Sequence, residues 1–294
     1  MNEADNPTSH SYFSQRLRLH YLDWGNDDAP HMLLIHGIHD HCHTWDWMAQ
    51  ALRERYHVVA PDLRGHGDSE WSRGSSYSWL EYVQDIAQLV RQQKLAPLTV
   101  VSHSMGGSIG ALYAGTFPDA VDKLVIIEGV GLYPARFGSD PAARLAQWIR
   151  SNHALAGRVP RRYGRLEDAY QRMQEMNPHL SPDQASHLTI HGSSQNEDGT
   201  YTWKFDNYTH TRSPYDIPNQ DVAALWERIE CPVLIVNSRE GYPHRIGQNG
   251  TVRHFRNVEL VEVDDAGHWT HHDQLARCIE VVGSFLDVPL ATEV

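Results

Sequence analysis

Cysteine is scarce in this chain, which has only three among its 294 residues: Cys42, Cys231 and Cys278. They are far apart and odd in number, so they cannot form the disulfide framework that stabilises a small secreted domain. The first ten residues have neither a basic start nor an apolar stretch, so we expect no signal peptide. Both observations favour a cytoplasmic protein.

Long apolar runs and clusters of positive charge are also missing. No window approaches the length of a membrane-spanning helix, so we expect no membrane span. The formal net charge is -12, from 25 basic and 37 acidic residues, which argues against the basic surface that nucleic-acid binding requires. Since 40% of the residues are hydrophobic, the chain can bury a large core. We expect a globular protein whose partner is a small molecule.

The chain does contain apolar runs that alternate with stretches of helical spacing. The runs that indicate buried strands begin at Leu17, Met32, His57, Leu98, Lys123, Pro232 and Val258. Between them, apolar residues recur at helical intervals, as at Leu80, Val83 and Ile86. Strands that are almost wholly apolar and alternate with helices are typical of a parallel sheet covered by helices on both faces. The predicted fold class is therefore α/β.

This alternation is interrupted once, between residues 129 and 221. Seven prolines break the helical stretches of that segment: Pro134, Pro141, Pro160, Pro178, Pro182, Pro214 and Pro218. Because strands and helices alternate again afterwards, the segment is an insertion into one domain. We predict a flexible N-terminal tail over 1–15, a core over 16–128 and 222–294, and a helical cap over 129–221.

A candidate nucleophile lies in the turn that follows the strand beginning at Leu98. The pentapeptide Ser102-His103-Ser104-Met105-Gly106 is similar to G-x-S-x-G, in which a strained turn exposes a serine between a strand and a helix. A serine hydroxyl is a weak nucleophile and needs an adjacent base. The pattern favours Ser104 as the nucleophile, with Ser102 in place of the first glycine.

A histidine that can serve as this base follows the last predicted strand. The segment Asp264-Asp-Ala-Gly-His268 places His268 at the carboxyl edge of the sheet, where open α/β sheets form their sites. We predict that His268 is the general base. Its neighbours His271 and His272 lack the preceding Asp-Ala-Gly and are less suited to the role.

Backbone N–H groups for an oxyanion hole are expected from two turns. His36-Gly37-Ile38 follows an earlier strand, so the N–H of Ile38 can point to the same place as the N–H of Met105. We predict that Ile38 and Met105 form the oxyanion hole, and that His36, Gly37 and His103 line the site.

Four motifs occur in one order along the chain: His36-Gly37, Asp62-Leu-Arg-Gly-His-Gly-Asp-Ser69, Ser102-His-Ser-Met-Gly-Gly107 and Ala266-Gly-His268. In this order they resemble the α/β-hydrolase superfamily over nearly the whole chain. The resemblance implies a mostly parallel eight-stranded sheet, a helical cap over the active site and a triad in the order serine, acid, histidine. The predicted cap, around Asn177-Pro-His-Leu-Ser181 and Thr202-Trp-Lys-Phe-Asp206, resembles more narrowly the serine hydrolase-like proteins.

Two carboxylates compete for the role of the triad acid, which orients the histidine and stabilises its charged form. In most of the superfamily the acid follows the strand after the cap, and Glu240 is the only carboxylate there. The same alignment can instead place Gly241 at that position, which would leave it empty. The alternative is an acid at the end of the preceding strand, as in haloalkane dehalogenases, and Glu128 fits it. Because a carboxylate that ends an apolar strand is costly to bury without partners, we favour Glu128 slightly.

Histidines also alternate with other residues at His36, His39, His41 and His43, which could indicate a metal cluster. The segment follows a glycine turn and enters a helix, so these side chains do not share one face, and a polar rim of the site is the simpler interpretation. We expect neither a metal nor a cofactor. Aromatic residues of the predicted cap, including Trp148, Tyr201, Trp203, Phe205 and Tyr208, fit an acyl pocket and a small cap core equally well.

The reaction that these residues favour is carboxylesterase-like hydrolysis of a small-molecule ester through an acyl-enzyme on Ser104. Cleavage of a carbon–carbon bond, a lactone or a thioester on the same triad remains open. So does a function of another class, because a protein of this fold that has lost a triad member can act as a non-catalytic binding protein.

Overall fold

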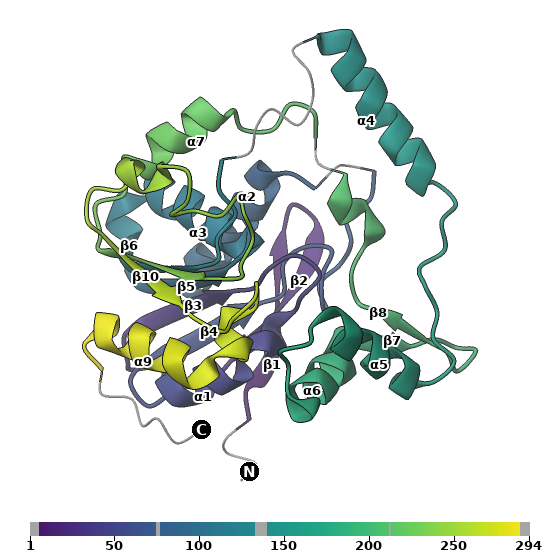
Figure 1. Cartoon of the computed structure of the whole chain (residues 1–294), viewed down its shortest axis with the longest axis horizontal. Helices are drawn as coiled ribbons and strands as arrows, with labels where there is room; N and C mark the ends of the chain where they lie inside the picture. The colour runs from purple at the N-terminus through teal and green to yellow at the C-terminus, as the bar shows by residue number, and fades with distance from the viewer. Residues whose placement is uncertain (1–5, 75–76, 133–139, 212, 289–294) are drawn as a thin grey trace.

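The computed structural model describes residues 6–74, 77–132, 140–211 and 213–288. Its strands are β1 (Thr8–Ser14), β2 (Leu17–Asp23), β3 (His31–Ile35), β4 (His57–Pro61), β5 (Leu98–His103), β6 (Val121–Ile127), β7 (Ser193–Gln195), β8 (Tyr201–Trp203), β9 (Val233–Ser238) and β10 (Val258–Val263). Eight of them form one sheet in the order β1-β2-β4-β3-β5-β6-β9-β10 (Figure 1). The pairs β1-β2 and β2-β4 are antiparallel, and the other pairs are parallel. The prediction of a mostly parallel eight-stranded sheet is confirmed.

Helices cover both faces of this sheet, as Figure 1 shows. The helices outside the interrupted segment are α1 (Asp46–Leu52), α2 (Trp79–Gln93), α3 (Met105–Thr116), α7 (Asn219–Trp226), α8 (Thr270–Asp273) and α9 (Leu275–Leu286). Because successive side chains of a strand point to opposite faces, Leu33 packs with α2 and α3 while Leu34 packs with α1 and α9. The two apolar layers fix the positions of the strand ends, where the candidate site residues lie.

The N-terminal segment differs from the prediction of a flexible tail over residues 1–15. Residues 8–14 form strand β1, which pairs with β2 along its whole length. The prediction is therefore wrong for these residues. Strand β1 lies at the edge of the sheet, and only its Tyr12 and Ser14 are buried, while its other side chains are polar or exposed. Such a strand has no apolar run that could reveal it.

The interrupted segment forms α4 (Pro141–Leu155), α5 (Leu166–Met176), α6 (Pro182–Gly192), the hairpin β7-β8 and the 3₁₀ helix η4 (Asn207–His210). We call residues 140–211 the insertion. Helices α5 and α6 pack on each other around Leu180, Ala185 and Leu188, whereas α4 extends away from the sheet in Figure 1 and has no buried residue. Helix α7 crosses the predicted boundary at 221 and packs on α3, so the core resumes at Asn219. No helix within the described ranges is both long and apolar enough to cross a membrane.

Candidate active site

Ser104 lies in the turn between β5 and α3 with a backbone φ of 53° and ψ of -117°. This strained conformation is held because the Ser104 N–H donates to Ile127 O at 2.9 Å. The turn packs so closely that a Cβ on Gly106 would lie 2.3 Å from Ile35 O. Ser102, at the position of the usual first glycine, is buried and donates its hydroxyl to Val125 O at 2.8 Å. A serine is therefore accommodated there without loss of the turn.

His268 contacts both Ser104 and a carboxylate. Its Nε2 lies 2.8 Å from Ser104 Oγ, and its Nδ1 lies 3.2 Å from Glu128 Oε2. Because an ionised carboxylate only accepts hydrogen bonds, Nδ1 carries the proton and Nε2 is free to accept the hydroxyl proton of Ser104. The structure thus brings together three of the residues singled out from the sequence, over separations of 164 and 140 positions along the chain.

Glu128 follows β6 directly and its side chain is completely buried. Its carboxylate accepts hydrogen bonds from the N–H of Ser238 at 2.7 Å and from the N–H of Tyr242 at 2.9 Å. Arg245 adds an ion pair, with Nε 3.0 Å from Oε1. These partners compensate for the cost of removing a charged group from water. The residue also has a positive φ of 50°, a strained backbone that the surrounding contacts must stabilise.

Glu240, the alternative acid, lies elsewhere. Its side chain is 61% exposed, and its carboxylate is 3.7 Å from His179 Nε2. The next residue, Gly241, explains how the space is used: a Cβ there would lie 2.2 Å from Glu128 Oε2. A side chain at position 241, just after β9, would need this space. Glu128, from the end of the neighbouring strand, occupies it instead.

Arg245 was not identified from the sequence as a site residue. Besides its ion pair with Glu128, it donates to Tyr242 O at 2.6 Å and to Ser238 O at 2.7 Å, so it fixes the backbone that donates to the carboxylate. A signal was present, because a carboxylate buried at the end of an apolar strand requires a cationic partner. No local pattern distinguishes this arginine from the others.

The turn after β3 lies directly against the nucleophile. A Cβ on Gly37 would be 3.1 Å from Ser104 Cβ, so only glycine allows this approach. The N–H of Met105 opens α3, at a position whose N–H has no acceptor within the helix. The N–H of Ile38 donates to no other group in the described part of the chain. Two backbone donors thus remain unused next to Ser104.

His36 and His103, which were predicted to line the site, are both enclosed by protein, as Ser104 is. His36 donates from Nδ1 to Gly37 O at 2.6 Å and accepts from the Leu63 N–H at 2.9 Å. Burial lowers the pKa of His36 to about 3, so this imidazole is neutral. His103 donates from Nε2 to His268 O at 2.8 Å, and burial holds its pKa well below the ordinary value. Both histidines thus form hydrogen bonds with the backbone of segments that form the candidate site.

The loop Pro61–Ser69 fixes the position of the chain that follows Ile38. Buried Asp62 accepts hydrogen bonds from the N–H groups of Cys42 at 2.7 Å and Asp68 at 2.9 Å, and pairs with His20 Nδ1 at 2.7 Å. Burial alone would raise the pKa of Asp62, but these contacts hold it well below its ordinary value. This charge therefore remains at neutral pH and anchors the loop.

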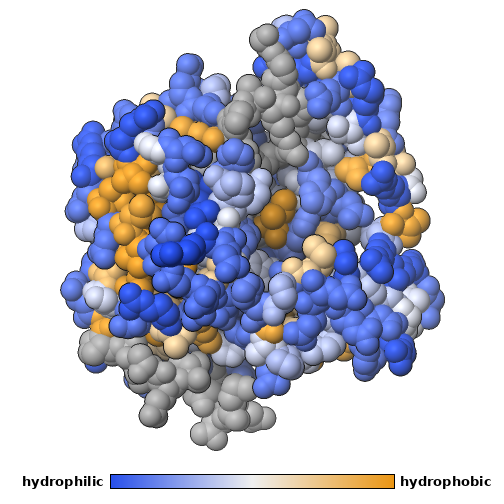
Figure 2. All heavy atoms as spheres, viewed as in Figure 1, coloured by the Kyte–Doolittle hydropathy of each residue, from blue (hydrophilic) through white to orange (hydrophobic). Residues whose placement is uncertain are grey.

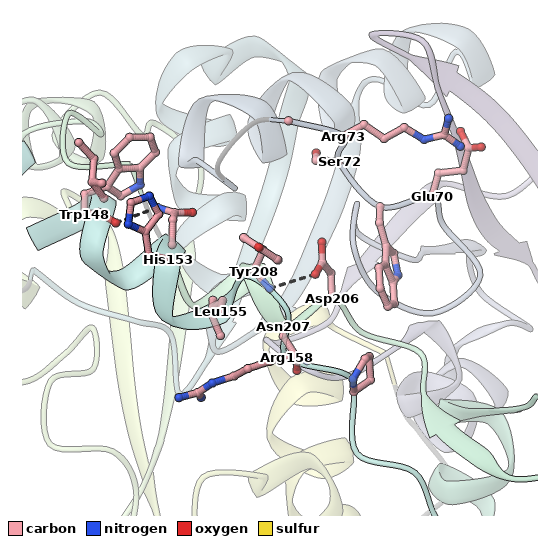
Figure 3. Close-up of a pocket in the computed structure, with 15 residues that line it drawn as sticks. Glu70, Ser72, Arg73, Trp148, His153, Leu155, Arg158, Asp206, Asn207 and Tyr208 are labelled. Atoms are coloured by element: carbon pink, nitrogen blue, oxygen red, sulfur yellow. Dashed lines mark hydrogen bonds between the residues drawn. The ribbon is translucent and has the colours of Figure 1, made fainter.

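A cavity of about 910 Å³ lies between α4, residues 70–74 and η4 (Figure 3). Trp148 and Tyr208, two of the aromatic residues noted in the sequence, line it, but Ser104, His268 and Glu128 do not. The 3₁₀ helix η4 borders the cavity and also contacts the turn after β3, because Thr209 Oγ1 lies 3.2 Å from Nε2 of His39, the residue after Ile38. Figure 2 shows that the surface is hollowed below α4. The cavity is therefore adjacent to the candidate site.

Comparisons with known proteins agree with the fold described above. A family model described as "Alpha/beta hydrolase family" matches residues 32–281. Serine hydrolase-like protein 2 of Homo sapiens is 26% identical over 226 residues, which are 74% of this chain and 71% of that protein. An esterase of Mycobacterium tuberculosis is 27% identical over 280 residues, 90% and 85% of the two chains. Among solved structures, the thioesterase domain from the curacin biosynthetic pathway superposes with a TM-score of 0.81 at 22% identity, covering 94% of this chain and 99% of that domain.

Proposed function

The chain belongs to the alpha/beta hydrolase family, and from this premise we propose that it is a serine hydrolase that cleaves a carboxylic ester through an acyl-enzyme on Ser104. The observation that carries the proposal is the continuous path from Ser104 Oγ through the His268 ring to Glu128, with contacts of 2.8 and 3.2 Å. The names of two relatives, an esterase and a serine hydrolase-like protein, agree with this class of reaction.

In the first half of the reaction, Ser104 Oγ attacks the carbonyl carbon of the ester while His268 Nε2 takes the hydroxyl proton. The carbonyl oxygen becomes an oxyanion that the N–H groups of Met105 and Ile38 stabilise. His268 then gives its proton to the departing alcohol, and the acyl group stays on Ser104. In the second half, water loses a proton to His268 and attacks the acyl-enzyme. The acyl–oxygen bond to Ser104 then breaks, the acid leaves, and His268 returns the proton to Ser104 Oγ.

Glu128 is the acid of the proposed triad. It accepts from His268 Nδ1, which holds the ring in the tautomer needed for proton transfer and stabilises the imidazolium that forms. The ion pair with Arg245 and the two backbone donors hold the carboxylate in place. The close approach of Gly241 to Glu128 supports this assignment, since a residue with a side chain after β9 would compete for the same space.

The insertion is proposed to act as a cap over this site. Its helix α6 contacts both site segments: His41 donates from Nε2 to Leu188 O at 3.1 Å, and Gln184 donates to His272 O at 3.0 Å. The cavity beside η4, lined on one side by Trp148 and Ile149, is the space proposed for the part of the substrate that extends away from the ester carbon.

The test is covalent labelling of the full chain with a fluorophosphonate, which reacts with activated serines, together with hydrolysis of p-nitrophenyl esters. The wild-type chain should carry one adduct on Ser104 by peptide mass spectrometry. Ser104→Ala should lose the adduct and the esterase activity, while Ser108→Ala, a buried serine of α3 that donates to Val130 O, should retain both.

Labelling that survives Ser104→Ala would refute the assignment of the nucleophile. A folded wild-type chain that is neither labelled nor active would favour the non-catalytic binding protein. Matched thioester and lactone substrates separate the remaining alternatives, because the proposal requires the largest kcat/KM for carboxylic esters.

A further inference from the structure

Four side chains with metal-ligand chemistry gather where the insertion meets the core. His43 belongs to the 3₁₀ helix η2 (Cys42–Trp45), Asp46 opens α1, and His187 and His191 lie one turn apart on α6. Their possible ligand atoms, one from each residue, all lie within 4.8 Å of one another. We call these four residues the histidine cluster. None of them touches Ser104, His268 or Glu128, so the cluster is distinct from the proposed triad.

The polar atoms of the histidine cluster converge but only partly satisfy one another. Asp46 Oδ2 lies 2.8 Å from His43 Nδ1 and 3.0 Å from His187 Nε2. The first contact is a hydrogen bond. The second lacks hydrogen-bond geometry, which leaves His187 Nε2 buried without a hydrogen-bond partner among the described residues, and the other oxygen of the carboxylate, Asp46 Oδ1, has none there either. Burying polar atoms in this state is costly. A bound cation would relieve that cost.

We propose that the histidine cluster binds one divalent transition-metal ion, with Zn²⁺ as the reference ion, through three imidazoles and one carboxylate. Imidazole nitrogen and carboxylate oxygen are ligands that Zn²⁺ accepts in tetrahedral sites. His187 and His191 are four residues apart, so both imidazoles lie on the same side of α6. The other two ligands come from the core, so the site forms only where the two parts meet.

The side chains must move a short way to bind the ion. Zinc bonds of about 2.0–2.1 Å place tetrahedral ligand atoms about 3.3 Å apart, whereas the present limit is 4.8 Å. The rings of His43 and His191 are stacked with centroids 3.7 Å apart, and those of His187 and His191 are 4.5 Å apart. All four residues are partly exposed, so the rings can rotate and an ion can reach them.

The ion would connect α6 directly to one of the two segments that hold the proposed active site, the segment after β3. His43 lies five residues after Ile38, in the helix η2 that follows the turn proposed to supply the oxyanion hole. On the other side, Trp47 contacts the ring of His187 at 4.7 Å and the ring of His272 at 5.5 Å, four residues beyond His268. A bound ion therefore fixes the insertion to the core without taking part in the chemistry, and its binding does not depend on whether the chain is an esterase.

The experiment is calorimetric titration of ZnCl₂ into the metal-stripped full chain without an affinity tag. The wild-type chain should bind one equivalent. The double variant His187→Ala/His191→Ala should bind at least about 100-fold more weakly, as expected when half of the ligands are lost. The matched control is His153→Ala/His179→Ala, which removes two exposed histidines of the insertion outside the cluster and should bind like wild type.

Two further readouts report on the same site. Excess Zn²⁺ should raise Tm in wild type and control but not in the cluster variant, because an ion that binds only the folded state stabilises it. The visible spectrum of the Co²⁺ complex should show tetrahedral nitrogen and oxygen coordination that the cluster variant lacks. Equal affinity in wild type and cluster variant would assign the ion to another group, such as Asp23, Asp27 and His57, and would overturn the proposal. Absence of binding to wild type would do the same.

Discussion

Helices α3 and α4 differ in how much of each is enclosed, as their sequences suggest: α3 has no charged residue, whereas α4 has Arg144 and Arg150. In α3, every residue from Met105 to Gly115 is buried, whereas the 15 residues of α4 include no buried one. The first helix begins at the nucleophile and is enclosed by the sheet and its neighbours. The second lies over a cavity and exposes Leu145 and Ile149. The core thus fixes the reacting groups by close packing, while this part of the insertion is not fixed in that way.

Beside the apolar packing of Tyr208 and Trp269, the insertion is held to the core by polar contacts. Besides α6, these include the hydrogen bond from the Tyr77 hydroxyl to Asp206 at 2.7 Å and the ion pair between Lys204 and Asp68 at 2.8 Å. Polar groups that lose such a contact can bond to water instead, so separation costs less than opening an apolar core. We therefore expect changes in the core to affect chemistry and stability, and changes in the insertion to affect substrate choice.

The largest expected effect comes from the proposed base. His268→Ala removes the group that takes the proton of Ser104, and kcat for a p-nitrophenyl ester should fall by about 10⁴-fold or more. His179→Ala in the insertion, whose imidazole pairs with exposed Glu240, should stay within about twofold of wild type. Steady-state kinetics on both folded variants checks this, and a comparable loss in the two would remove the distinction between core and insertion.

The second prediction concerns acid. Burial lowers the pKa of His36 and His272 to about 3 and of His41 and His66 to about 4. As pH falls through about 6.5, these four histidines therefore take up protons in the unfolded chain but not yet in the folded one. Asp40 acts in the opposite direction. Burial raises its pKa to about 7, so near pH 5 the folded chain holds one proton that the unfolded chain lacks. Near pH 5, unfolding should take up at least about two protons, which lowers the free energy of unfolding by about 3 kcal/mol per pH unit.

Urea denaturation at several pH values between 5 and 8 measures this slope. The stability should be greatest near neutral pH and should decrease steadily below pH 6.5. A free energy of unfolding that does not change between pH 7 and 5 would show that these histidines are not buried as neutral groups.

The third comparison uses one apolar side chain from each of the two helices. Ile109→Ala in α3 leaves a cavity in a fully enclosed position and should cost about 2–4 kcal/mol of stability. Leu145→Ala in α4 removes a side chain that is 42% exposed and should cost less than about 0.5 kcal/mol. Denaturant unfolding measures both, and similar costs would mean that α4 is packed as firmly as α3.

The smallest effect is expected at the cavity. Trp148→Ala enlarges the space proposed for the acyl part, so kcat/KM for long-chain p-nitrophenyl esters should fall by about tenfold while that for the acetate ester is unchanged. Ile190→Ala changes an exposed residue of α6 outside the cavity lining and serves as the control. An equal loss for short and long esters would mean that Trp148 does not select for chain length.

Much of the core could be predicted because its strands are apolar runs. The run from Leu98 ends in a turn whose small residues are required by close backbone contact, and this local pattern identified Ser104. Strand β1 was missed because an edge strand with polar side chains carries no such pattern. The hairpin β7-β8 is similar, since its six residues are mostly polar or partly exposed.

The remaining features depend on contacts between distant parts of the chain. The choice between Glu128 and Glu240 rests on which strand end lies against His268, and the sequence offered two hints: Gly241 after β9, and the cost of burying Glu128 without partners. His43 was considered together with its alternating neighbours, but in space it meets His187 and His191 of the insertion. Periodicity along the chain cannot reveal a pairing that the tertiary structure creates.

In the proposed triad the acid comes from the end of β6 and not from the loop after β9. The decisive measurement is kcat/KM of Glu128→Gln and Glu240→Gln with one ester, after both variants are shown to be folded. We expect a loss of about 10³–10⁴-fold for Glu128→Gln and no change beyond about twofold for Glu240→Gln. A large loss for Glu240→Gln, or equally small losses for both, would refute Glu128 as the triad acid.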